Sequence, residues 1–186
     1  MNLDAVAADL GTDRGLRWLW IGVWVLFALA MGACMSNGAD KVADPVLQDA
    51  SRVPGFAQVG FRVEPPSGAA SKHCALLADT EATRSLGLMN RTDLAGYDGM
   101  VFAFQKDTQA QFHMQNTLIP LSVAFFDSSG TFVSALDMLP CIQGTDCERY
   151  AATGPYRTAI EVAQGGLPNL GIGPGSSISV GGPCSG

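Results

Sequence analysis

The longest apolar run of the chain lies near its start, at residues 18–31 (WLWIGVWVLFALAM), and contains no charged residue. A run of this length suits the hydrophobic core of a signal peptide better than a complete membrane span, which needs about 20 residues. Arg14 and Arg17 precede the run, and small residues follow it. We therefore expect residues 1–33 to be a signal peptide or membrane anchor.

The run ends in the sequence Ala-Met-Gly-Ala-Cys at residues 30–34. This ending resembles the lipobox of bacterial lipoproteins, in which cleavage before the cysteine leaves its sulfur, here that of Cys34, to carry diacylglycerol. Met31 departs from the pattern, where Leu is more usual. The alternative is an uncleaved N-terminal helix in which Cys34 is a buried thiol. Both interpretations place the chain after about residue 36 outside the cytoplasm, anchored to the cell membrane by a lipid or by that helix.

The segment that follows has no sustained hydrophobic period until about residue 60 and contains Pro45 and Pro54. We expect residues 34–70 to comprise the lipobox cysteine and a flexible tether. Residues 61–70 could add an edge strand before Pro65 and Pro66 stop it.

Residues 71–186 show short apolar or alternating segments separated by turn residues, the pattern of a β-rich domain. Asp79-Thr80 offers a cap for a two-turn helix over 81–89, and 165–170 could form one helical turn. Asp127 to Gly130 has the composition of a tight hairpin. The pattern predicts a mainly β (α+β) fold, a compact β-sandwich or partly open barrel of about seven strands. The strand segments are 74–78, 99–104, 111–114, 121–126, 132–136, 158–162 and 177–180.

Composition supports this fold class and excludes some partners. The chain has 22 Gly and 10 Pro, which is typical of many turns, and its formal net charge is −6. An acidic chain is a poor partner for nucleic acid or anionic lipid headgroups, so we expect no nucleic-acid binding. No nucleotide, cofactor or metal signature is present, and we expect no cofactor and no metal. Met89, Met100, Met114 and Met138 lie among apolar residues and are expected in the core rather than at a copper site.

Four cysteines remain after the anchor, and an even number in an exported chain indicates two disulfides with three possible connectivities. Cys141 and Cys147 would close a short loop, whereas Cys74 and Cys184 would join the start of the domain to its end. A zinc site formed by His73, Cys74, Cys141 and Cys147 is the alternative, but these residues lack the close ligand spacing of structural zinc sites.

Five sequence blocks follow one another in the part of the chain expected to be exported. They are Asp79–Arg84, Gly87–Met89 with Arg91, Gly99–Phe102, Phe112–Leu121 (FHMQNTLIPL), and a late Glu-Val strand at Glu161 before a closing Gly-Ile segment. In order and spacing these blocks resemble the prokaryotic family called domain of unknown function 192. The resemblance covers roughly residues 72–181. It implies a compact β-rich domain and brings no established activity.

Four positions depart from the family pattern. His113 stands where the family usually has Trp, Gln115 where it has Lys, and both Ser122 and Ser176 where it has Asp. A mechanism that needs a carboxylate at residue 122 or a cation at residue 115 is therefore excluded for this chain.

No residue is assigned a catalytic role, but a set of polar residues could form a concave binding patch. His113 could act as a general base, although a position that relatives fill with Trp favours packing or ligand stacking. The Asn116 amide and the neighbouring Thr117 hydroxyl could bind a polar ligand or form hydrogen bonds with the backbone of a turn. Arg84 and Arg91 could hold an anion. Alternatively, they could form ion pairs with Asp79, Asp98 or Glu161. The ligand-binding candidates are Arg84, Arg91, His113, Asn116, Thr117 and Glu161.

These observations favour an envelope-anchored, non-enzymatic binding or accessory module for a small polar ligand. One alternative is a carboxylate-dependent hydrolase that pairs Asp79 or Asp137 with Glu161 outside the cytoplasmic membrane. No Gly-x-Ser-x-Gly nucleophile motif is present. A third possibility is an interaction domain that binds another envelope protein through an exposed apolar patch.

Overall fold

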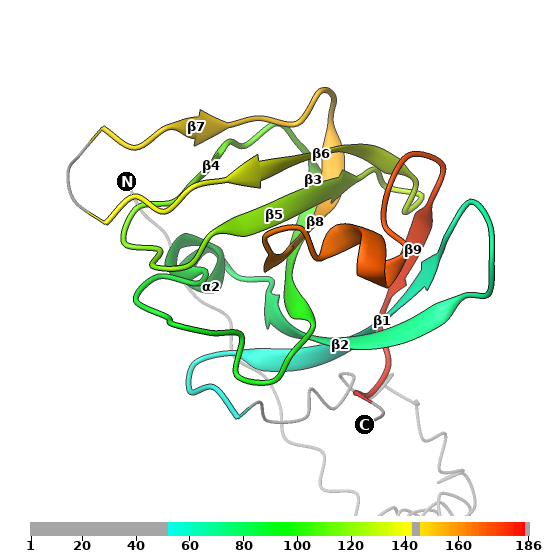
Figure 1. Cartoon of the computed structure of the whole chain (residues 1–186), viewed down its shortest axis with the longest axis horizontal. Coiled ribbons are helices and arrows are strands. Elements are labelled where there is room, and N and C mark those ends of the chain that lie inside the picture. Colours follow the sequence, from blue (N-terminus) through cyan, green and yellow to red (C-terminus); the bar gives the residue numbers. More distant parts are fainter. Residues whose placement is uncertain (1–51, 143–145, 185–186) are drawn as a thin grey trace, which may run out of the picture. The chain divides into compact units, whose positions relative to one another are not determined.

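The computed structural model describes residues 52–142 and 146–184, which form a β-rich unit (Figure 1). The expected signal peptide, Cys34 and the first part of the expected tether lie outside the described residues. No helix within the described ranges is long and apolar enough to span a membrane. The elements are β1 (Ala57–Glu64), β2 (Ser71–Ala78), α2 (Glu81–Leu86), β3 (Gly99–Thr108), β4 (Phe112–His113), β5 (Leu121–Phe126), β6 (Phe132–Met138), β7 (Arg149–Tyr150), β8 (Tyr156–Ala163), the 3-10 helix η1 (Leu167–Leu170) and β9 (Ser177–Val180).

Seven strands form one curled sheet in the order β6-β5-β8-β3-β2-β1-β9, and β4 pairs with β7 in a separate two-stranded ribbon. Every pairing in the large sheet is antiparallel except that of β2 with β3. The prediction of a mainly β fold with about seven strands is confirmed, and the sheet has the form of a half-barrel (Figure 1).

The two edges of the sheet meet at the hairpin between β5 and β6. Thr131 bridges Ser177, and the Ile178 N–H donates to the Gly130 carbonyl at 2.8 Å. Gly130 has a φ of +81°, and a Cβ atom there would collide with the Ile178 carbonyl oxygen. Only glycine fits this left-handed position at so close an approach, which explains the glycine in the predicted turn.

Apolar residues cover both faces of the sheet, which is why its central strands read as continuous apolar runs. All six residues of β5 are buried. We call the two groups the cavity-side cluster, which includes Met100, Phe125 and Tyr156, and the opposite cluster, which includes Phe126 and Ile160. Of the methionines expected in the core, Met100, Met114 and Met138 are fully buried in the cavity-side cluster.

Both predicted disulfides are present. Cys74 in β2 is joined to Cys184, 110 residues later and just beyond β9, with a Cα–Cα distance of 5.1 Å. Cys141 is joined to Cys147, with a Cα–Cα distance of 5.9 Å. Because these four sulfurs are paired with one another, none is left as a thiolate for the alternative zinc site.

The β-rich domain begins earlier than the expected residue 71. Strand β1 lies inside the segment expected as a tether, yet it is hydrogen-bonded between β2 and β9. Phe61 is 2% exposed and Val63 is fully buried, so β1 belongs to the sheet core and not to a spacer. Pro65 and Pro66 end this strand as expected.

Helix α2 is shorter than the predicted 81–89. It starts at the expected cap, where the Thr80 side chain accepts a hydrogen bond from the Thr83 N–H. It ends at Leu86 because Gly87 adopts a positive φ of 47° and turns the chain back toward the sheet.

Candidate functional site

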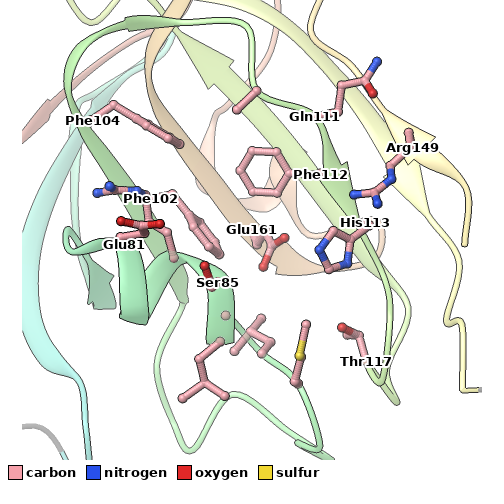
Figure 2. A pocket seen from close by; sticks show the side chains of 16 residues that line it. Glu81, Ser85, Phe102, Phe104, Gln111, Phe112, His113, Thr117, Arg149 and Glu161 are labelled. Atoms are coloured by element: carbon pink, nitrogen blue, oxygen red, sulfur yellow. The ribbon is translucent and has the colours of Figure 1, made fainter. Parts of the chain in front are cut away.

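A cavity of about 270 Å³ lies beside α2 and is walled by β3, β4, β7 and β8 (Figure 2). It opens on the face of the sheet that carries the cavity-side cluster. Its lining is Glu81, Arg84, Ser85, Leu86, Gly87, Leu88, Met89, Phe102, Phe104, Ala110, Gln111, Phe112, His113, Thr117, Arg149 and Glu161.

Three aromatic rings, those of Phe102, Phe104 and Phe112, contribute to the apolar part of the cavity. The rings of Phe102 and Phe112 pack edge to face with centroids 5.0 Å apart, and Phe112 packs in the same way on Phe125 at 5.5 Å. Phe104 packs edge to face on Tyr156 at 5.4 Å. These contacts hold the rings in fixed orientations, so the apolar wall is preformed.

Glu161 is the polar centre of the cavity. It lies in β8 between Met100 of β3 and Val123 of β5, and it is only 5% exposed. Its carboxyl group points into the cavity near Phe112 and His113 (Figure 2). Within the described residues this carboxyl has no hydrogen bond or ion pair, and burial raises its pKa to about 8. At neutral pH it is therefore largely protonated and offers an O–H donor to the cavity.

His113 and Arg149 form the wall opposite α2. They are directly paired across the β4–β7 ribbon. Burial, and then the charge of Arg149, lower the pKa of His113 below its ordinary value, so this ring is neutral at pH 7. The Gln115 N–H donates to Nδ1 of His113 at 3.4 Å, a long contact.

Arg84 is held at the edge of the cavity by backbone groups. Its Nη1 atom donates to the carbonyl oxygens of Asp79 at 2.5 Å and Ala103 at 2.9 Å. The guanidinium lies over the Phe104 ring, 4.9 Å from its centroid. These contacts place a permanent positive charge beside the aromatic wall.

Comparison with known proteins decides the family. The model of the DUF192 family, described as "Uncharacterized ACR", matches residues 63–180. The chain belongs to this family. The match begins within β1, in agreement with the earlier start of the domain. Among the curated proteins, none is significantly similar in sequence.

Solved structures of other proteins share this fold. A Novosphingobium aromaticivorans protein of unknown function is 29% identical, with a TM-score of 0.60 over 76% of this chain and 99% of its own. A Sinorhizobium meliloti protein, whose proposed role is that of a transcription regulator, is 26% identical, with a TM-score of 0.58 over 67% of this chain and 95% of its own.

Four of the six residues predicted to bind a ligand in this DUF192 protein line the cavity: Arg84, His113, Thr117 and Glu161. Arg91 does not line the cavity. Helix α2 ends at Leu86, so Arg84 and Arg91 do not share one helix face. The Arg91 guanidinium lies over the Phe56 ring instead, 5.9 Å from its centroid. Asn116 has a positive φ of 55° in a turn, and its carbonyl accepts from the Asn90 N–H at 2.7 Å.

Sequence reasoning missed several cavity residues, chiefly Arg149, Glu81, Ser85 and Gln111. Arg149 lies in none of the blocks that resemble DUF192. It reaches the cavity because the Cys141–Cys147 disulfide turns the chain back and β7 then pairs with β4. Phe112 lies directly beside the candidate His113 in the predicted strand 111–114, and this position could have indicated an aromatic ring at the site.

The carboxylates expected for a hydrolase are not assembled as predicted. Asp137 accepts hydrogen bonds from Ser122 at 2.5 Å and Gln164 at 3.2 Å and does not line the cavity. Asp79 does not line it either, whereas Glu81 does. Within the described residues, no group of three or more His, Cys, Asp and Glu side chains is arranged to hold a metal ion.

A separate hydroxyl–imidazole–carboxylate chain lies outside the cavity. Ser71 Oγ is 2.6 Å from Nε2 of His73, and Nδ1 of His73 is 3.5 Å from Oδ2 of Asp98. The same Asp98 oxygen accepts from the Cys74 N–H at 2.9 Å, so the carboxylate also fixes the backbone beside the disulfide. None of these residues lines the cavity.

Proposed function

We propose that this DUF192 protein is a binding or accessory module of the cell envelope, and that its cavity takes a small polar ligand without catalysing its conversion. The observation that carries the proposal is Glu161: a carboxyl group 5% exposed, with no hydrogen-bond partner among the described residues, that faces a preformed aromatic cavity. Burial disfavours the charged form of this carboxyl, and a ligand that accepts a hydrogen bond from the neutral form would stabilise it.

The envelope location rests on two observations. Paired cysteines persist in oxidising compartments outside the cytoplasm, and this domain contains two disulfides. The apolar run with its following Cys34 supports export and attachment to the membrane by a lipid or an N-terminal helix. Mass spectrometry of the native protein tests the anchor: a diacylglyceryl adduct on Cys34, lost in C34S, is expected for a lipoprotein. An unmodified chain that retains residues 1–33 would support the helix anchor instead.

The binding function is tested by the melting temperature of the full-length chain in detergent. Cell-wall fragments, neutral sugars and small anions are added separately, because a ligand that binds only the folded state raises its stability by mass action. We expect at least one class to raise the melting temperature of the wild type. The variant S85W, which places an indole at the cavity mouth, should abolish that rise. If no class shifts the wild-type melting temperature, the binding function is wrong.

A second candidate is a carboxylate-dependent hydrolase, and one observation favours it. Glu81 and Glu161 line the same cavity, and the pKa of Glu161 is raised to about 8, as a general acid requires. Hydrolysis of nitrophenyl glycosides that disappears in both E81Q and E161Q would support this candidate over a binding module.

Two other roles have weaker support. Leu139 and Ile142, which flank Cys141, are 62% and 60% exposed, and they offer apolar contacts to an envelope partner. Transcription regulation, proposed for the Sinorhizobium meliloti protein, is disfavoured here because a net charge of −6 opposes contact with the DNA backbone.

A further inference from the structure

We propose that the cavity selects a small anion with a planar apolar group, and that the anionic end accepts hydrogen bonds from the Glu161 carboxyl and the Arg149 guanidinium. This inference rests on the proposed binding function and names the chemical class of its ligand. It follows from the charge balance of the cavity, from the hydrogen-bond donors that are free in it, and from the shape of its apolar wall.

The charged residues of the lining are Glu81 and Glu161 against Arg84 and Arg149. Because burial keeps Glu161 largely neutral at pH 7, two cations face one anion. The cavity is therefore positive in a chain whose net charge is −6. A local field of this sign attracts anions and opposes cations.

Among the hydrogen-bond donors that line the cavity, Glu161 and Arg149 suit the anionic end of a ligand, because Glu161 is buried and Arg149 carries a positive charge. Arg149 is exposed, and among the described residues no side chain or carbonyl accepts a hydrogen bond from its guanidinium. Arg84, by contrast, already donates to the carbonyls of Asp79 and Ala103, so it contributes charge more than hydrogen bonds. A carboxylate has two acceptor oxygens and could satisfy both free donors with charge-assisted hydrogen bonds.

The apolar wall determines the size and shape of the ligand's apolar group. Phe102, Phe104 and Phe112 present aromatic rings to a cavity of about 270 Å³. This volume lies at the small end of the range for ligand sites and suits a single-ring molecule. A planar ring can pack on these aromatics as they pack on one another.

Three nearly isosteric probes separate charge from shape: benzoate (anion), benzamide (neutral) and benzamidine (cation). Each is titrated calorimetrically into the full-length chain in detergent at pH 7, with acetate and inorganic phosphate as anions without a ring and glucose as a neutral polar ligand. We expect benzoate to bind at least tenfold more tightly than benzamidine, and more tightly than benzamide, acetate, phosphate or glucose.

The pH dependence identifies the Glu161 contact. The charged or titratable groups that line the cavity around Glu161 are Glu81 and Arg84 of α2, His113 of β4 and Arg149 of β7. Between pH 7 and pH 9, Glu161 is the group among them expected to change charge. Its ionisation would place a negative charge against the ligand, so benzoate affinity should fall across this interval. The E161Q side chain retains a hydrogen-bond donor that does not titrate. In this variant the fall in benzoate affinity between pH 7 and pH 9 should disappear.

Arg149 is tested by R149Q, with R62Q as the matched control. Arg62 is also an exposed arginine, but it pairs with Glu64 on β1 and does not line the cavity. We expect R149Q to weaken benzoate binding about tenfold or more, and R62Q to leave it unchanged. Circular dichroism and the melting temperature establish that both variants are folded.

The outcomes separate this inference from the function on which it rests. If benzamide, benzamidine or glucose binds more tightly than benzoate and S85W blocks that binding, the cavity binds ligands but the anion preference is wrong. If benzoate binds without response to R149Q or to pH, the assigned contacts are wrong. If none of the probes and none of the ligand classes binds, both the inference and the binding function fail.

Discussion

His113 in β4 lies directly opposite Arg149 in β7, in the two-stranded ribbon that forms one wall of the cavity. The ribbon is held at one end by Cys141, whose N–H donates to the Met114 carbonyl at 3.2 Å and whose sulfur is joined to Cys147. The position of the Arg149 side chain therefore depends on a disulfide that does not itself touch the cavity.

We predict that the double variant C141S/C147S binds benzoate more weakly than the wild type. Loss of this short crosslink should cost on the order of 2 kcal/mol of unfolding free energy, and it should free the ribbon that carries His113 and Arg149. Amide hydrogen exchange at β4 and β7 should accelerate while exchange at β5 is unchanged. Equal benzoate affinity in the two proteins would show that the disulfide does not position the wall.

The control for this prediction is C74S/C184S. That crosslink spans 110 residues, so its loss should cost more stability, about 4–5 kcal/mol in the chain-entropy model. Neither cysteine lines the cavity, and this disulfide does not hold the β4–β7 ribbon, so at a temperature where the variant remains folded its benzoate affinity should be closer to the wild-type value.

Ser122 and Asp137 explain how this chain tolerates a departure from the family pattern. The buried Ser122 hydroxyl donates to Asp137 and accepts from the Gly165 N–H at 2.9 Å. The resemblance implies Asp at residue 122, and here a carboxylate reaches this position from the neighbouring strand β6. We predict that S122D is destabilised at pH 7 because two carboxylates would face each other.

The compensating exchange S122D/D137S should recover most of that stability, measured by urea unfolding. S122A should cost about 1–3 kcal/mol, because it leaves the Gly165 N–H without its acceptor. If S122D alone is as stable as the double variant, the two positions are not coupled.

The raised pKa of Glu161 also predicts a pH dependence of stability. A carboxyl whose pKa is higher in the folded than in the unfolded protein favours folding most at low pH, and this contribution is lost as pH rises from about 4.5 to about 8. At pH 9 the free energy of unfolding of E161Q should therefore be higher than that of the wild type. At pH 5 this difference in unfolding free energy should shrink or reverse. Parallel pH profiles for the two proteins would contradict the burial of an ionisable group here.

The sequence predicted most of the sheet but only part of the site. The apolar run 121–126 coincides with β5 and Thr80 caps α2, because both signals are local. The sequence predicts a tether up to residue 70 with at most an edge strand over 61–70, because the pairing that places β1 inside the sheet joins it to β9 at the other end of the domain. Arg149 was missed for the same reason: its place in the cavity follows from the β4–β7 pairing, which no local pattern encodes.

The central claim is that Glu161 presents a neutral, unpartnered carboxyl to the cavity. The most direct measurement is an NMR titration of the Glu161 side-chain carboxyl carbon in the full-length chain, with E161Q used to assign the resonance. We predict a midpoint near pH 8 in the free protein and a higher midpoint when benzoate is bound, because the anion stabilises the protonated form. A midpoint near the ordinary value of 4.5, unmoved by benzoate, would contradict the account.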